Sequence, residues 1–137
     1  MRMIPLTPVL AIVICMQAHP AAAGERPIVA VFGIQGKDAG LPGKLLKSLT
    51  DYLGTAVSEG GVYRVVPSAD IRRALLQKKK ESYKACYDQK CQIELGRELA
   101  ANKSLSTTIL RLGEQCVVTA RMYDLRSQAT DTSAKAS

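Results

Sequence analysis

Apolar and polar positions along the chain predict a strand, a helix and a second strand in its first half. Residues 27–34, PIVAVFGI, form an almost unbroken apolar run, which is typical of a strand buried on both faces. Leucines then recur at helical spacing, and Gly60 and Gly61 end that helix. A short strand follows at 62–67, stopped by its proline. This order implies parallel strands joined through a helix.

The second half of the chain predicts two more helices and a hairpin. One helix begins near Ser68 or Asp70, either of which can cap it, and Asp88 can cap another that continues to residue 102. Two alternating strands follow, joined by Gly113-Glu114-Gln115, at 105–113 and 116–125. We therefore predict the α/β class. The expected architecture is a single three-layer domain with a mixed sheet of four or five strands and about three helices (β-α-β-α-α-β-β).

The first 23 residues have the pattern of a secretory signal peptide. Arg2 gives a positive start, the stretch VLAIVICM is apolar but too short to span a bilayer, and small residues at Ala21 and Ala23 suit cleavage. The isoleucine before Cys15 is too large for a lipoprotein signal, so membrane association is expected only if the segment is retained or lipidated. Three parts are predicted: a signal peptide at 1–23, the α/β domain at 24–126, and a polar tail or weak edge strand at 127–137.

Export places the protein in the periplasm or outside the cell and changes the meaning of its charge. The chain has a formal net charge of +7, and a basic balance often indicates nucleic acid as a partner. Export separates the protein from the nucleic acids of the cytoplasm. Acidic envelope polymers, anionic lipid or an acidic protein surface are therefore the expected partners.

The glycine-rich segment after the first strand lacks a nucleotide-binding motif. A phosphate-binding loop needs two glycines five apart followed by Lys and Ser or Thr, and the sequences ending at Lys37 and Lys44 each fail at two of these positions. A dinucleotide motif needs glycines at relative positions 1, 3 and 6, whereas Gly33, Gly36 and Gly40 have 1, 4 and 8. The free N–H groups at the helix start near Lys44 still offer a contact for an anion.

The residues needed for common enzymatic chemistry are missing. The one histidine, His19, lies in the predicted signal segment, which leaves no Ser-His-Asp, Cys-His or ordinary zinc site. Glu94 and Glu98 are one helical turn apart, but Arg97 beside them favours a solvated helix face over an acid–base pair. We expect no enzymatic activity, no metal and no cofactor.

Three cysteines remain after the predicted cleavage. Cys86 and Cys91 flank a predicted helix break and are close enough for a disulfide that joins two helices. They lack the Cys-x-x-Cys spacing that is usual for a redox-active pair. Cys116 is in phase with the core face of its strand, which predicts a buried, inert thiol. The alternatives for Cys116 are pairing with Cys91 or with a cysteine of another chain.

A basic segment in the middle of the chain has two interpretations. It is either an interaction surface or the solvated face of a helix. The residues of the predicted surface are Arg72, Arg73, Lys78, Lys79, Lys80 and Lys84.

The order of these segments resembles a family of exported α/β domains, over residues 28–125. These domains are similar to the N-terminal domain of TolB, with relatives in the curli-secretion lipoprotein CsgG and in penicillin-binding-protein activator lipoproteins. The resemblance is carried by VAVFGIQGKDAGLPGKLLKSLTDYL, GGVYRVVP, ADIRRAL, CYDQKCQIELGRELAANKSL and the closing hairpin. The run CYDQKCQIELGRELAA is similar to a myxobacterial subgroup. The resemblance implies a periplasmic or outer-membrane-associated module that docks onto other proteins and has no enzymatic activity.

The predicted function is accordingly non-catalytic protein–protein interaction in the bacterial envelope. Loops carry binding residues more often than core positions do, so the segment from Gly36 to Lys44 is a second expected contact surface beside the basic helix. Two alternatives stay open. One is a domain that binds a small ligand or an anion near Lys44, and the other is a truncated remnant of a larger envelope protein.

Overall fold

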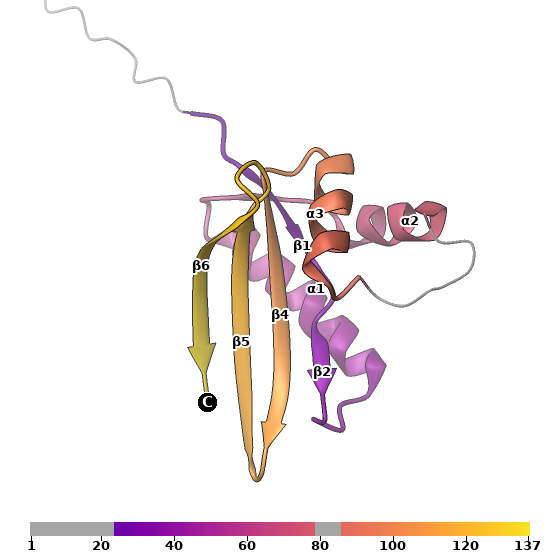
Figure 1. The fold of residues 1–137 in the computed structure, drawn as a ribbon, viewed down its shortest axis with the longest axis vertical. Coiled ribbons are helices and arrows are strands. Elements are labelled where there is room, and N and C mark those ends of the chain that lie inside the picture. Colours follow the sequence, from indigo (N-terminus) through magenta and orange to yellow (C-terminus); the bar gives the residue numbers. More distant parts are fainter. Residues whose placement is uncertain (1–23, 79–85) are drawn as a thin grey trace, which may run out of the picture.

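The structure is a computed structural model that describes residues 24–78 and 86–137. Its elements, in chain order, are β1 (Ile28–Val31), β2 (Gln35–Lys37), α1 (Gly43–Glu59), β3 (Arg64–Val65), α2 (Ser68–Lys78), α3 (Gln89–Glu98), β4 (Lys103–Leu112), β5 (Gln115–Asp124) and β6 (Ala129–Ala136). The strands lie in the order β3-β1-β4-β5-β6, and β2 pairs with β4 past the end of β1 (Figure 1). The predicted α/β class with a mixed sheet is confirmed, although the sheet has six strands.

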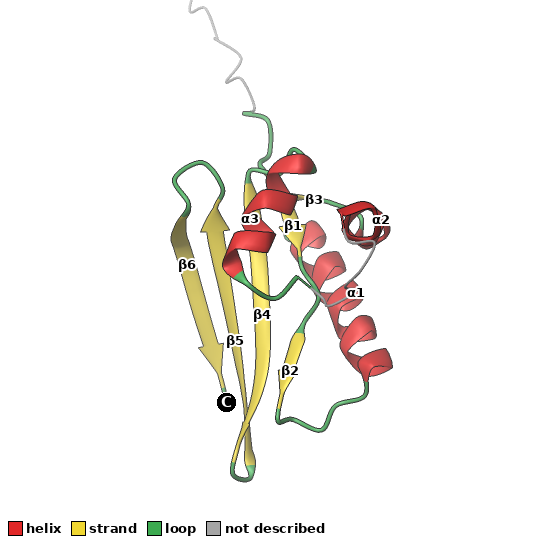
Figure 2. Ribbon diagram, turned by 45° about the vertical axis from the view of Figure 1, so that its right-hand side comes forward, coloured by secondary structure: helices red, strands yellow, loops and turns green. Residues whose placement is uncertain are grey.

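Helices cover both faces of the sheet around β1. On one face, Leu53 of α1 packs over Val29 and Val31. On the other face, α2 and α3 pack over Ala30 and Phe32 (Figure 2). The apolar run that predicted a strand buried on both faces therefore lies in the middle of three layers, where Val29 and Ala30 are fully buried.

A bend divides the first predicted strand and creates β2, which the sequence did not predict. At the bend, the Ile34 backbone N–H donates to the hydroxyl of Thr50, 3.0 Å away, and thereby attaches the chain to α1. The chain then continues as β2, parallel to β4. A Cβ at Gly36 would lie 3.2 Å from the side chain of Leu46, so the glycine permits this close approach of strand and helix.

A disulfide lies at the entry to α3. Asp88 caps this helix as predicted, and its carboxylate accepts a hydrogen bond from the backbone N–H of Cys91 at 2.8 Å. Cys86 and Cys91 form the predicted disulfide, with 5.6 Å between their Cα atoms, but Cys86 lies in the turn before α3, so the bond closes this turn instead of joining two helices. The amide of the buried Gln92 donates to the Cys86 carbonyl at 3.0 Å, which fixes the same turn from inside.

The β4–β5 hairpin is confirmed, but its far end extends beyond the helices. Its loop has two residues, and the first, Gly113, has the positive φ of 62° that a tight hairpin loop needs. The prediction of a buried Cys116 is wrong, because this thiol is exposed. Its phase along the strand matches that of Val118, which packs against the core cluster under α1, but Cys116 lies beyond that cluster.

The outermost strand, β6, is held by its backbone pairing to β5 and by one ion network. All its residues are exposed. A bulge opposite Met122 and Tyr123 leaves Asp131 without a direct partner on β5. Instead, the ammonium of Lys103 on β4 pairs with the Asp131 carboxylate at 2.8 Å, and the Asp124 carboxylate lies 3.5 Å from the same ammonium. We call these three residues the Lys103 latch.

Candidate binding groove

A groove with a volume of about 420 Å³ lies between α1 and α2 at the carboxyl end of β1. The chain leaves β1 through α1 to reach β3 on one side, and returns through α2 and α3 to β4 on the other side. Ligands of α/β sheets bind at such a reversal of strand order, outside the carboxyl ends of the strands. We call this site the α1–α2 groove. Its apolar lining comes from Val31, Ile34, Leu46, Ile71 and Leu75, and its polar lining from Lys47, Asp51, Ser68, Arg72 and Tyr87.

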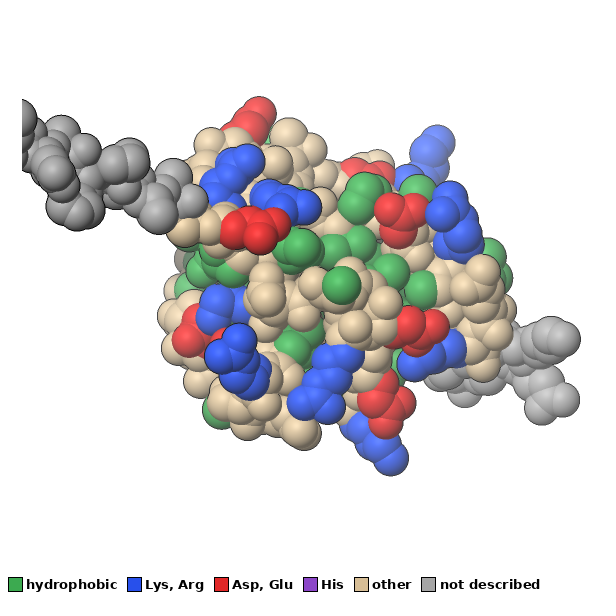
Figure 3. Space-filling view, turned by 90° about the horizontal axis from the view of Figure 1, so that it is seen from above, with side chains coloured by type: hydrophobic (Ala, Val, Ile, Leu, Met, Phe, Trp, Pro, Cys, Tyr) green, Lys and Arg blue, Asp and Glu red, His purple; other side chains and the backbone are tan. Residues whose placement is uncertain are grey.

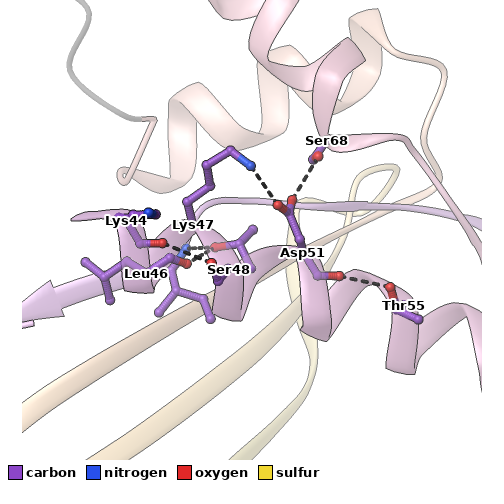
Figure 4. A network of polar contacts seen from close by, with 9 residues as sticks. Lys44, Leu46, Lys47, Ser48, Asp51, Thr55 and Ser68 are labelled. Atoms are coloured by element: carbon purple, nitrogen blue, oxygen red, sulfur yellow. Dashed lines mark hydrogen bonds and ion pairs between the residues drawn. The ribbon is translucent and has the colours of Figure 1, made fainter. Parts of the chain in front are cut away.

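One wall of the groove is a polar network centred on Asp51. Lys47, one turn earlier in α1, donates to one carboxylate oxygen at 2.8 Å, and the Ser68 hydroxyl at the start of α2 donates to the other at 3.0 Å (Figure 4). The hydrogen bond from Lys47 is the largest cause that lowers the pKa of Asp51 below its usual value, with partial burial opposing it. Asp51 therefore stays ionised and joins the two helices across the groove.

The three cations of α2 that the structure describes have different surroundings. Arg73 pairs with Asp70 at 3.1 Å, and Lys78 pairs with Glu98 of α3 at 2.6 Å. Arg72 lines the α1–α2 groove and has no ion pair within residues 24–78 and 86–137. The predicted basic surface is thus divided, and only Arg72 of these three borders the groove.

Of the remaining predicted lysines, only Lys44 lies in the described part of the chain. Lys79, Lys80 and Lys84 lie outside the described residues. Lys44 is exposed in the first turn of α1 but does not line the groove, although its neighbour Gly43 does. The carbonyl of Pro42 accepts the Leu45 N–H at 2.9 Å, but no side chain caps α1 and its first turn has no acidic residue, so no side-chain charge opposes the positive end of the helix dipole there.

A second depression of about 480 Å³ lies on the other side of α2, against β3. It is lined by Arg64, Arg73 and Asp70 among others. Because Arg73 is already paired there, this depression offers less unsatisfied charge than the α1–α2 groove. On the face of the molecule seen in Figure 3, basic and acidic side chains are interspersed around apolar ones, so no patch of a single sign dominates that face.

Within the described ranges, no cluster of three or more His, Cys, Asp or Glu side chains has the arrangement of a metal site. In the same part of the chain, no helix is both long enough and apolar enough to cross a membrane. The features that characterise the groove are its volume, its apolar lining and its charged side chains.

Sequence reasoning missed most of the polar lining of the groove. Lys47 and Asp51 have the helical i, i+4 spacing that predicts an ion pair, but this spacing does not predict a site. Ser68 is 17 residues from Asp51, and their contact depends on how α1 and α2 pack. Tyr87 reaches the groove from the disulfide turn, a position that only the tertiary structure determines.

Comparison with known proteins identifies the fold. The sequence matches no protein-family model, and no curated protein matches it. Among solved structures, the LpoB C-terminal domain from Salmonella enterica matches with a TM-score of 0.69 and 13% identity over 81% of each chain. The fold is similar to that of LpoB. Lipoprotein GNA1162 from Neisseria meningitidis follows with a TM-score of 0.56 and 18% identity, covering 80% of this chain and 78% of its own.

TolB from Acinetobacter baumannii matches through one part of its chain. The TM-score is 0.50 at 12% identity, over 82% of this chain and 23% of TolB. The predicted resemblance to TolB-like and penicillin-binding-protein activator domains is therefore confirmed for the fold. The myxobacterial subgroup stays a prediction.

Proposed function

We propose that this chain is a non-catalytic module of the bacterial envelope that binds a protein partner through the α1–α2 groove. The observation that carries the proposal is the groove itself, which combines an apolar lining with an arginine that has no ion pair in the described part of the chain. Its fold is similar to those of LpoB and of a lipoprotein, which supports a place in the envelope. Export through residues 1–23, to the periplasm or beyond, is part of the same proposal.

Cross-linking in the native envelope tests the proposal. The tagged chain is expressed with its own N-terminus, cross-linked, recovered and analysed by mass spectrometry, alongside R72E and R73E. These two variants make the same charge change at adjacent positions, but only Arg72 borders the groove. We expect the unaltered chain and R73E to recover one or two discrete envelope proteins and R72E to lose them. Equal recovery with R72E, or no recovery by any form, would contradict the proposal.

A second candidate function is binding of an anion at the start of α1 near Lys44. The uncapped first turn of this helix favours it. It predicts that phosphate or nucleotides raise the melting temperature in proportion to the logarithm of their concentration above Kd, and that K44A abolishes the effect. Because Lys44 is outside the groove, this alternative rests on one helix end and has less support.

A further inference from the structure

The lining of the α1–α2 groove is specific enough to indicate the chemistry of its occupant; this step rests on the proposed function. The groove lies between two helices, and its apolar lining side chains come from β1, the bend after it, α1 and α2. A volume of about 420 Å³ is within the range of small binding sites and accommodates a few side chains rather than a whole helix. An occupant must therefore be slender and must contribute apolar atoms.

The charges around the groove favour an occupant that carries a carboxylate. Both oxygens of Asp51 already accept hydrogen bonds, from Lys47 and from Ser68. Arg72 of α2 also lines the groove, where its charge adds to the hydrogen bond from Lys47 in lowering the pKa of Asp51. The guanidinium of Arg72 forms no ion pair within the described residues, and a planar guanidinium binds a carboxylate through two hydrogen bonds. The uncapped start of α1 at Gly43 adds positive potential at the same site. A cationic occupant would meet Arg72 and Lys47 and be repelled by both.

Gly33 leaves part of the groove wall without a side chain. It follows β1 in the bend, lines the groove, and a Cβ built there would have nothing within 4 Å. Its backbone is therefore open to an approaching chain. An extended peptide can bring its own backbone close to such a glycine.

We propose that the α1–α2 groove binds a short extended segment of a partner protein in which apolar side chains flank a carboxylate side chain. The apolar side chains contact Leu46, Ile71 and Leu75, and the carboxylate pairs with Arg72. The segment passes over Gly33.

Three capped synthetic peptides test this chemistry with the full chain. The first is acetyl-Gly-Leu-Glu-Leu-Gly-amide; the second has Lys in place of Glu, and the third has Ala in place of both Leu. Binding is followed by NMR shift changes and by titration calorimetry. We expect saturable binding of the first peptide, in the weak range of about 0.1 to 1 mM, and binding at least about tenfold weaker for the other two. Similar affinities for all three, or no binding of the first, would overturn the proposal.

Two groove variants and two matched controls locate the contact. G33L fills the groove without a change of charge, while G24L makes the same change at a glycine that is equally open but outside the groove. R72E removes the guanidinium that is proposed to pair with the carboxylate of the peptide, and R73E is its control. We expect binding of the first peptide to fall at least about tenfold in G33L and R72E and to persist in G24L and R73E. Thermal melting verifies that each variant is folded, and R72A replaces R72E if that variant unfolds.

The peptide result and the cross-linking result separate the two proposals. Capture of an envelope protein that depends on Arg72, together with no discrimination among the peptides, overturns the acidic-apolar segment but leaves the docking function. Loss of capture in every form, together with selective peptide binding, overturns the docking function in the envelope and leaves the groove chemistry.

Discussion

The two ends of the sheet are built on different principles. Around β1, each strand residue from Val29 to Val31 is buried under a helix on one face or the other. At β6, no residue is buried, and the strand depends on hydrogen bonds to β5 and on the Lys103 latch. Burial of apolar area contributes much more free energy than net hydrogen bonding does. The covered end therefore determines whether the protein folds, while the β6 end can change in sequence or separate locally at low cost.

The comparison also explains where the groove lies. The α1–α2 groove is at the covered end, where two helices and the end of β1 fix the lining residues in place. A binding site is positioned most accurately on rigid elements. The exposed β6 edge lacks this support.

The largest expected effect comes from emptying the covered core. Phe32 is 1% exposed and packs under α2 and α3. We expect Phe32→Ala to lower the free energy of unfolding by about 3–5 kcal/mol, because the cavity adds to the lost burial. Thr132→Ala on β6 should change it by less than about 0.5 kcal/mol. Urea denaturation of both variants measures the difference, and equal effects would refute the contrast between the two ends.

An intermediate effect is expected at the Lys103 latch. Asp131→Asn removes the charged acceptor of the Lys103 ammonium, whose side chain is only 16% exposed. We expect a loss of about 1 kcal/mol or less in global stability, but several-fold faster hydrogen exchange at β6 amides with β1 unchanged. Lys135→Gln is the matched control, because it removes a charge from the same strand without touching the latch. Equal acceleration in both variants would show that the latch does not hold β6.

The pH dependence of the latch follows from its pKa shifts. Hydrogen bonding to Asp131 raises the pKa of Lys103 above 10.5. The stability that protonated Lys103 adds to the folded state is therefore complete below pH 10.5 and is lost as the pH rises through the raised pKa. The backbone N–H of Ser127 is the largest cause that lowers the pKa of Asp124 below 3.8. The stability that ionised Asp124 adds to the folded state is present above pH 3.8 and is lost as the pH falls through the lowered pKa. NMR signals of β6 should therefore shift at a less extreme pH than those of β1, both when the pH is raised and when it is lowered.

The sequence predicted the covered end better than the uncovered end, for a physical reason. The apolar run at β1 and the cap at Asp88 are local signals of structure. β2 has no such signal, since Gln35–Lys37 is polar. This segment becomes a strand through its backbone pairing with β4, which is a tertiary contact. The groove needed the packing of α1 against α2, which brings Asp51 to Ser68. Strand phase alone placed Cys116 on a core face, but coverage by a helix is a tertiary property.

The smallest effect on stability is expected at Cys116, where the chemical readout is nevertheless large. The thiol is exposed near the tip of the β4–β5 hairpin, where Cys116 pairs with Arg111 of β4. A thiol reagent should therefore label the native protein at Cys116 without denaturant, and labelling at this position should disappear in Cys116→Ser. Cys86 and Cys91 should resist the reagent, because they form a disulfide. Peptide mapping identifies the labelled residue.

Cys116→Ser should also change the free energy of unfolding by less than about 0.5 kcal/mol, since the Cys116 side chain is exposed. A requirement for denaturant, or a cost of several kcal/mol in the serine variant, would place Cys116 in a core. In that case the boundary between the covered and uncovered parts of the sheet would lie farther along the hairpin. If the label attaches without loss of stability, the boundary on the face shared by Val118 and Cys116 lies between these two residues, although Val117 on the opposite face is buried.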